Sequence, residues 1–206
     1  MDSDTVWQHI DNERAWLADL LESLPQEAWQ QPSLCEGWRV RDVGAHLTFA
    51  HAQVRDLLWP AVRAGFRYDA LVRDTALRSP LTREQIVATL RGFVGSRQRV
   101  AFITDLEPLI DILVHIQDIC RPLGIDHPMP PDAAAAAANR VLSTPRPMRR
   151  WKPPRSTRLV ATDVDWAYGS GDEVRAPMGS LLLTLTGRRA VPRGSTPTPR
   201  RHPPAL

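Results

Sequence analysis

Four successive segments of the chain carry apolar residues at helical spacing, and this repetition limits the fold more than any other feature. The segments cover residues 3–24, 39–59, 82–100 and 107–124. Pro25 ends the first segment, and Pro122 with Gly124 ends the last. Thr82 to Gln85 has the capping-box form that opens a helix. Because each helix has one apolar face to bury, the four together predict a helix bundle.

Two of these segments carry side chains that suit a metal ion. Asp111 and His115 stand four residues apart, so both project from one face of their helix. His46 lies on or beside the apolar stripe of the segment at 39–59, whereas His51 faces elsewhere. Two histidines and a carboxylate match a catalytic zinc site with an open fourth position, and they also suit nickel, iron or manganese.

Spacing alone leaves other interpretations open. His46 also fits a hydrogen-bonded core histidine, and Asp111 with His115 also fits a surface pair one helical turn apart. Asp42 and Asp118 are candidates to orient the ligand imidazoles, but they also fit solvated charges. The residues by themselves therefore give a candidate metal site rather than an established one.

The sequence pattern changes after residue 145. Residues 158–177 predict two strands around a glycine hairpin turn at 169–171, and residues 178–187 predict a short apolar helix. We therefore expect a helix-bundle domain at 1–145, a small α+β domain at 146–189, and a disordered basic, proline-rich tail at 190–206. The expected fold class is mainly α.

Charge and composition restrict the partners. The formal net charge is +3, but from residue 146 onward Lys and Arg outnumber Asp and Glu three to one. This surplus fits a solvated tail or weak, nonspecific contact with nucleic acid, and we expect no specific nucleic-acid partner. No apolar run approaches the ~20 residues of a membrane span, and the first residues lack a signal-peptide pattern. We therefore expect a cytoplasmic protein without a membrane partner.

Motifs of several other enzyme classes are absent. The sequence has no G-x-S-x-G, no P-loop, and no G-x-G-x-x-G between a strand and a helix. The usual marks of acyl transfer, nucleotide hydrolysis and dinucleotide binding are therefore missing. Cys35 and Cys120 do not form a CxxC pair, and we expect both to be free thiols.

Three stretches of the chain resemble one protein family. Residues 29–51, WQQPSLCEGWRVRDVGAHLTFAH, resemble the W-x-x-P-S-x-C-x-G-W-x-V-x-D-V-x-A-H-L signature of the mycothiol-dependent maleylpyruvate isomerase family. Residues 111–124, DILVHIQDICRPLG, are similar to its H-x-x-D-x-x-R-x-x-G segment. Residues 158–188 look like the small C-terminal domain of these proteins.

The resemblance implies a DinB-like four-helix bundle that holds a divalent metal, usually zinc, through three side chains. It assigns His46 and His115 as metal ligands. The third ligand, four residues before the second histidine, is usually Glu in this family and is Asp111 here. Arg188 matches an arginine that would reach the active site from the C-terminal domain. After Arg188 the sequence departs from the leucine-rich continuation of the family, so we expect a shortened C-terminal domain.

The activity that the resemblance implies is thiol chemistry. A metal would favour the thiolate of mycothiol, which would attack a small-molecule electrophile in an isomerase or a thiol transferase. The alternative is a non-catalytic member that binds a metal or senses a ligand and acts through partner proteins. Both a monomer and a homodimer are compatible with the sequence.

Overall fold

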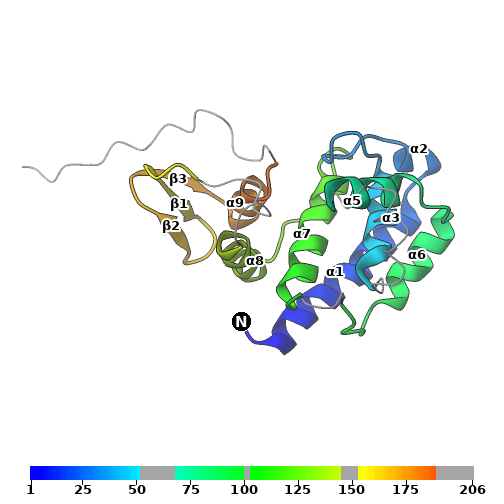
Figure 1. Ribbon diagram of the computed structural model, residues 1–206, viewed down its shortest axis with the longest axis horizontal. Coiled ribbons are helices and arrows are strands. Elements are labelled where there is room, and N and C mark those ends of the chain that lie inside the picture. Colours follow the sequence, from blue (N-terminus) through cyan, green and yellow to red (C-terminus); the bar gives the residue numbers. More distant parts are fainter. Residues whose placement is uncertain (52–67, 100–102, 145–152, 189–206) are drawn as a thin grey trace, which may run out of the picture. The chain divides into compact units, whose positions relative to one another are not determined.

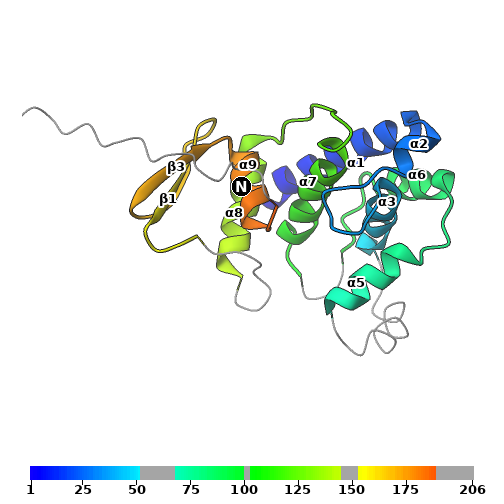
Figure 2. The same ribbon diagram turned by 90° about the horizontal axis from the view of Figure 1, so that it is seen from above.

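The structure, a computed structural model, describes residues 1–51, 68–99, 103–144 and 153–188. It divides into two compact units, Met1–Pro128 and Met129–Leu206. The described residues are mostly helical, with a three-stranded sheet in the second unit (Figures 1 and 2). The predicted mainly α fold class, with a small C-terminal α+β part, is confirmed.

The first unit contains the predicted helix bundle. Its elements are α1 (Ser3–Ser23), α2 (Gln26–Trp29), α3 (Val40–Leu47), the 3-10 helix η1 (Thr48–His51), α5 (Tyr68–Leu77), α6 (Arg83–Gly92) and α7 (Leu106–Cys120). α1 packs against α6 and α7, and α3 packs against α5, α6 and α7. The apolar faces of α1, α3, α6 and α7 form a core that includes Ile10, Leu17, Leu21, Val43, Ile86, Leu90, Leu109, Leu113 and Ile116.

Local hydrogen bonds set where these helices begin. The Asp2 carboxylate accepts the Thr5 N–H at 2.9 Å and caps α1. The predicted capping box of α6 is confirmed, because the Gln85 side chain accepts the Thr82 N–H at 2.8 Å and the Thr82 hydroxyl accepts the Gln85 N–H at 3.3 Å. α6 ends at Gly92, earlier than predicted. Gly95 follows with a φ of +79°, a left-handed backbone conformation that does not occur within a right-handed α-helix.

The predicted helix at 39–59 is shorter in the described residues. α3 ends at Leu47 and passes into η1, where the Thr48 hydroxyl donates to the Ala45 carbonyl at 2.7 Å. The rest of this prediction lies outside the described residues, as do the predicted tail at 190–206 and most of the linker before residue 153.

The second unit is a small α+β structure. Its elements are α8 (Pro131–Ser143), β1 (Thr157–Ala161), β2 (Ala167–Gly169), β3 (Asp172–Ala176) and α9 (Met178–Leu185). α8 packs on α9, and α9 packs on β1. The sequence placed α8 with the bundle by setting a boundary at 145, whereas the compact units divide between Pro128 and Met129.

The prediction of two strands around a glycine hairpin turn is wrong. The sheet has the order β2-β1-β3, with β1 antiparallel to β2 and parallel to β3. Residues 169–171 therefore join the two outer strands and pass across the start of β1, where the Asp172 N–H donates to the Ser156 carbonyl at 2.8 Å. Gly169 and Gly171 have φ values of +87° and +110°, and a Cβ on either would collide with a backbone carbonyl of residue 156 or 157.

Candidate metal centre

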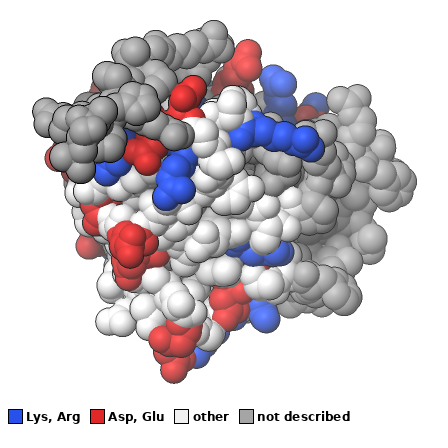
Figure 3. Space-filling model, turned by 90° about the vertical axis from the view of Figure 1, so that its left-hand side faces the viewer, with Lys and Arg blue, Asp and Glu red and all other residues white. Residues whose placement is uncertain are grey.

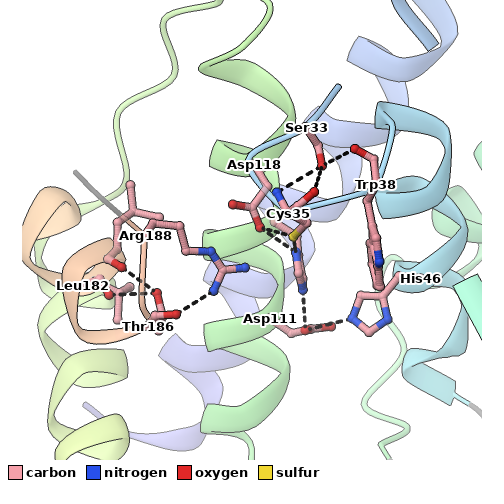
Figure 4. A network of polar contacts seen from close by, with 11 residues as sticks. Ser33, Cys35, Trp38, His46, Asp111, Asp118, Leu182, Thr186 and Arg188 are labelled. Carbon is pink, nitrogen blue, oxygen red and sulfur yellow. Dashed lines mark hydrogen bonds and ion pairs between the residues drawn. The ribbon is translucent and has the colours of Figure 1, made fainter. Parts of the chain in front are cut away.

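The three predicted ligands come together in the first unit. α3 presents His46, and α7 presents Asp111 (Figure 4). His115 follows Asp111 one turn later on α7. Asp111 Oδ1 lies 3.3 Å from His46 Nε2 and 3.3 Å from His115 Nε2. One ligand atom from each residue lies within 4.8 Å of the others.

The donor set and its spacing fit a divalent metal. In a tetrahedral site with bonds of about 2.0–2.1 Å, neighbouring ligand atoms lie roughly 3.3 Å apart. The two Asp111–histidine separations have this length. The carboxylate of Asp111 reaches both imidazoles although it is one methylene shorter than the glutamate that the resemblance implies. Two imidazoles and a carboxylate suit zinc and also nickel, iron or manganese.

The electrostatics of the centre favour a charged carboxylate. Burial raises the pKa of Asp111, but the charge of His46 and the hydrogen bond from His115 outweigh it and lower the pKa overall. Burial lowers the pKa of His115, yet its interactions with Asp111 and Asp118 raise that pKa well above the usual value. The side chains of His46, His115 and Asp111 are 17%, 13% and 35% exposed, so solvent reaches the centre at the carboxylate.

The two carboxylates considered for orienting the imidazoles differ in position. Asp118, at 0% exposure, accepts a hydrogen bond from His115 Nδ1 at 2.8 Å, on the side of the ring opposite Nε2. Asp42 is also fully buried, but it accepts bonds at 3.0 Å from the backbone N–H and Nε of Arg39, at the start of α3. Asp42 thus caps the N-terminus of α3, and Asp118 is the carboxylate that is placed to orient the His115 ring.

Sequence reasoning missed the contribution of the loop at residues 33–38. Cys35 Sγ lies 3.1 Å from Asp118 Oδ2 and 3.8 Å from His115 Nδ1, so Cys35, His115 and Asp118 form a second group of possible ligands. The Trp38 ring is stacked on His115 at 6.4 Å between centroids and meets the edge of His46 at 5.4 Å. The signal was present in the run from Ser33 to Trp38, but nothing local showed that it faces α7.

Arg188 belongs to the second unit. Its backbone N–H donates to the Leu183 carbonyl at 2.8 Å just after α9, and its Nη1 donates to the Thr186 carbonyl at 3.0 Å. Gly187, with a φ of +91°, provides the left-handed residue that this helix end requires. A catalytic role for Arg188 stays a prediction.

The fold and the centre define a class of protein: a helix bundle whose facing helices hold a two-histidine, one-carboxylate group. Residues 10–108 match the family model described as the mycothiol maleylpyruvate isomerase N-terminal domain. For residues 10–108 this match confirms the family that the sequence motifs predicted.

Two solved structures share the fold. One is a mycothiol-dependent maleylpyruvate isomerase, 13% identical, with a TM-score of 0.62 over 92% of this chain and 91% of that chain. The other is a variant of a mycothiol-dependent maleylpyruvate isomerase in which one histidine is replaced by alanine, 12% identical, with a TM-score of 0.63 and the same coverage. A comparison with curated proteins found no match.

Two further observations concern partners. No helix among the described residues is long and apolar enough to cross a membrane. On the face shown in Figure 3, the described Lys and Arg side chains lie among Asp, Glu and uncharged side chains and form no continuous basic surface.

Proposed function

We propose that this protein is a metal-dependent enzyme that activates mycothiol as a thiolate for attack on a small electrophilic substrate. The observation that carries the proposal is the convergence of His46, Asp111 and His115 in a chain of this family. Zinc is the favoured metal, and nickel, iron or manganese suit the same donors. The proposal places the enzyme in the cytoplasm.

The residues of the chain have distinct tasks in this proposal. His46 and His115 would hold the metal through Nε2, and Asp111 would hold it through Oδ1 while offsetting part of its charge. A divalent metal in this position supplies a Lewis acid that lowers the pKa of a bound thiol. Trp38, itself 9% exposed, covers both imidazoles and keeps water from that side of the ligands.

The product then depends on the fate of the carbon–sulfur bond that the thiol forms with the substrate. Addition to the double bond of a cis-enoyl acid, rotation about the resulting single bond and loss of the thiol give isomerisation. Retention of the new carbon–sulfur bond gives thiol transfer. The cationic side chain of Arg188 is the predicted partner for a carboxylate of the substrate or of the thiol.

The test combines metal content with thiol-dependent turnover. Protein purified without an affinity tag is assayed for bound metal, then for mycothiol-dependent isomerisation of maleylpyruvate and for loss of mycothiol with chlorodinitrobenzene. We expect near-stoichiometric metal and metal-dependent turnover of one electrophile class, both abolished by His46→Ala. A folded, metal-loaded protein that neither isomerises maleylpyruvate nor consumes thiol with chlorodinitrobenzene would instead support the non-catalytic, ligand-sensing alternative.

A further inference from the structure

The loop at residues 33–38 joins α2 to α3 and is held in one conformation by its own hydrogen bonds. The Ser33 N–H donates to the Trp38 carbonyl at 2.8 Å, and the Ser33 hydroxyl donates to the same carbonyl at 2.9 Å. The Cys35 N–H in turn donates to the Ser33 hydroxyl oxygen at 3.1 Å. The positions of Cys35 and Trp38 are therefore fixed relative to each other (Figure 4).

This loop is also bonded to the end of α7 that carries the candidate ligands. The Leu34 N–H donates to the Asp118 backbone carbonyl at 3.0 Å. The Cys35 thiol donates to Asp118 Oδ2 at 3.1 Å, and His115 Nδ1 lies 2.8 Å from that oxygen. An ionised carboxylate only accepts hydrogen bonds, so the His115 Nδ1 carries a proton on this side, and Nε2 on the other side of the ring faces Asp111 and His46.

We propose that Cys35 is a positioning residue of the metal centre. Its thiol holds the Asp118 carboxylate in the orientation that keeps the proton on His115 Nδ1 and fixes the ring plane of His115, while Trp38 of the same loop packs on that ring. The part of this proposal that concerns metal affinity rests on the proposed function. The orientation of His115 is independent of any metal.

The geometry argues against two other roles for this thiol. A thiolate nucleophile would stand 3.1 Å from a carboxylate oxygen of a fully buried aspartate, and two adjacent anions repel each other. A ligand in the same centre as Asp111 would have to face His115 Nε2, whereas Cys35 faces Nδ1, the other nitrogen of the ring. The thiol therefore acts through Asp118.

The first test needs no metal. In the metal-free protein, proton and nitrogen NMR of the histidine side chains reports the His115 Nδ1 proton and its exchange with water. We expect Cys35→Ala to speed this exchange by about tenfold or more, and Cys35→Ser, which keeps an O–H donor, to restore slow exchange. Cys120→Ala, which removes the other thiol, is the control and leaves the signal unchanged. An unchanged signal in folded Cys35→Ala would overturn the proposal.

The second test measures zinc affinity by competition with a chelator. Loss of a partner that orients a ligand typically weakens metal binding by about 10–100-fold, so we expect this range for Asp118→Asn and its lower end for Cys35→Ala. Cys35→Ser is expected to remain within about threefold of the parent, and equal affinities of the alanine and parent proteins would contradict the proposal. A parent that binds no zinc refutes the metal step of the proposed function, and the NMR result then decides the positioning role alone.

Cobalt substitution separates positioning from direct ligation. A cysteine thiolate bound to cobalt gives an intense near-ultraviolet charge-transfer band, whereas histidine and carboxylate ligands do not. We expect the cobalt-loaded parent to lack this band. A band that is present in the parent and absent from Cys35→Ser would identify Cys35 as a ligand and overturn the positioning role.

Discussion

Two histidine–carboxylate pairs in the first unit have nearly the same hydrogen-bond length but different surroundings. His115 Nδ1 lies 2.8 Å from Asp118 Oδ2, and His127 Nε2 lies 2.7 Å from Glu13 Oε2. Both carboxylates are buried, and both imidazoles are largely buried. The pairs alone therefore do not distinguish a functional histidine from a structural one.

The surroundings of each ring make the difference. The second nitrogen of His115 faces Asp111, and His46 lies close by. The ring of His127 is stacked on Trp16 at 3.5 Å between centroids, and no group of potential metal ligands among the described residues includes His127. Convergence of Asp111 and His46 on Nε2 of the ring, rather than the buried pair itself, makes His115 a candidate ligand.

The largest expected effect is on metal binding. His46→Ala removes one of three ligands and leaves the buried pair at His115 intact, so we expect at least about a 100-fold loss of zinc affinity. The matched change at the other pair, His127→Ala, is expected to leave zinc affinity unchanged. Chelator competition on both proteins measures this. Equal losses in the two variants would show that the metal does not bind at His46.

The two cysteines, one beside each pair, give the next contrast. Burial and, to a smaller extent, the charge of Glu13 raise the pKa of Cys120 to about 12, and its side chain is fully buried. Cys35 lies in a loop and is partly exposed. At pH 8 we expect iodoacetamide to alkylate Cys35 at least about tenfold faster than Cys120 in the folded protein, as followed by peptide mass spectrometry. Equal rates would mean that the end of α7 opens readily.

At the second pair the expected effect is on stability. Glu13→Ala leaves His127 without its partner inside the unit, which is expected to lower the free energy of unfolding by about 1–3 kcal/mol. Zinc affinity should be unchanged. Asp19→Ala, on the same helix but at a carboxylate that is 73% exposed, is the control and should unfold like the parent. Urea denaturation of the metal-free proteins measures the free energy of unfolding of both variants and the parent. Equal stability of Glu13→Ala and the parent would contradict a structural role for the Glu13–His127 pair.

The sequence predicted the parts of this comparison that depend on spacing along one helix. Asp111 and His115, four residues apart, share a face because of the helical repeat, and His46 faces them because it follows the apolar stripe of α3. The apolar periodicity also predicted the bundle itself.

The parts that sequence could not provide depend on contacts between distant residues. Cys35 meets Asp118 across 83 positions, and His127 meets Glu13 across 114, so no local pattern reveals either contact. The strand order β2-β1-β3 was missed for the same reason, because a glycine turn between two short strands resembles a hairpin until β1 is placed between them.

The smallest expected effect concerns the length of the carboxylate beside each histidine. Asp111 is 35% exposed, so Asp111→Glu has room to move its longer side chain toward solvent, and the resemblance implies a glutamate in this position. We therefore expect zinc affinity within about tenfold of the parent, or ~1.4 kcal/mol. The matched change Glu13→Asp shortens a buried carboxylate away from His127 and is expected to cost about 1 kcal/mol of stability at constant zinc affinity. A loss of zinc affinity in Asp111→Glu as large as that in His46→Ala would mean that the centre requires the shorter side chain. That result would set this chain apart from relatives that carry glutamate.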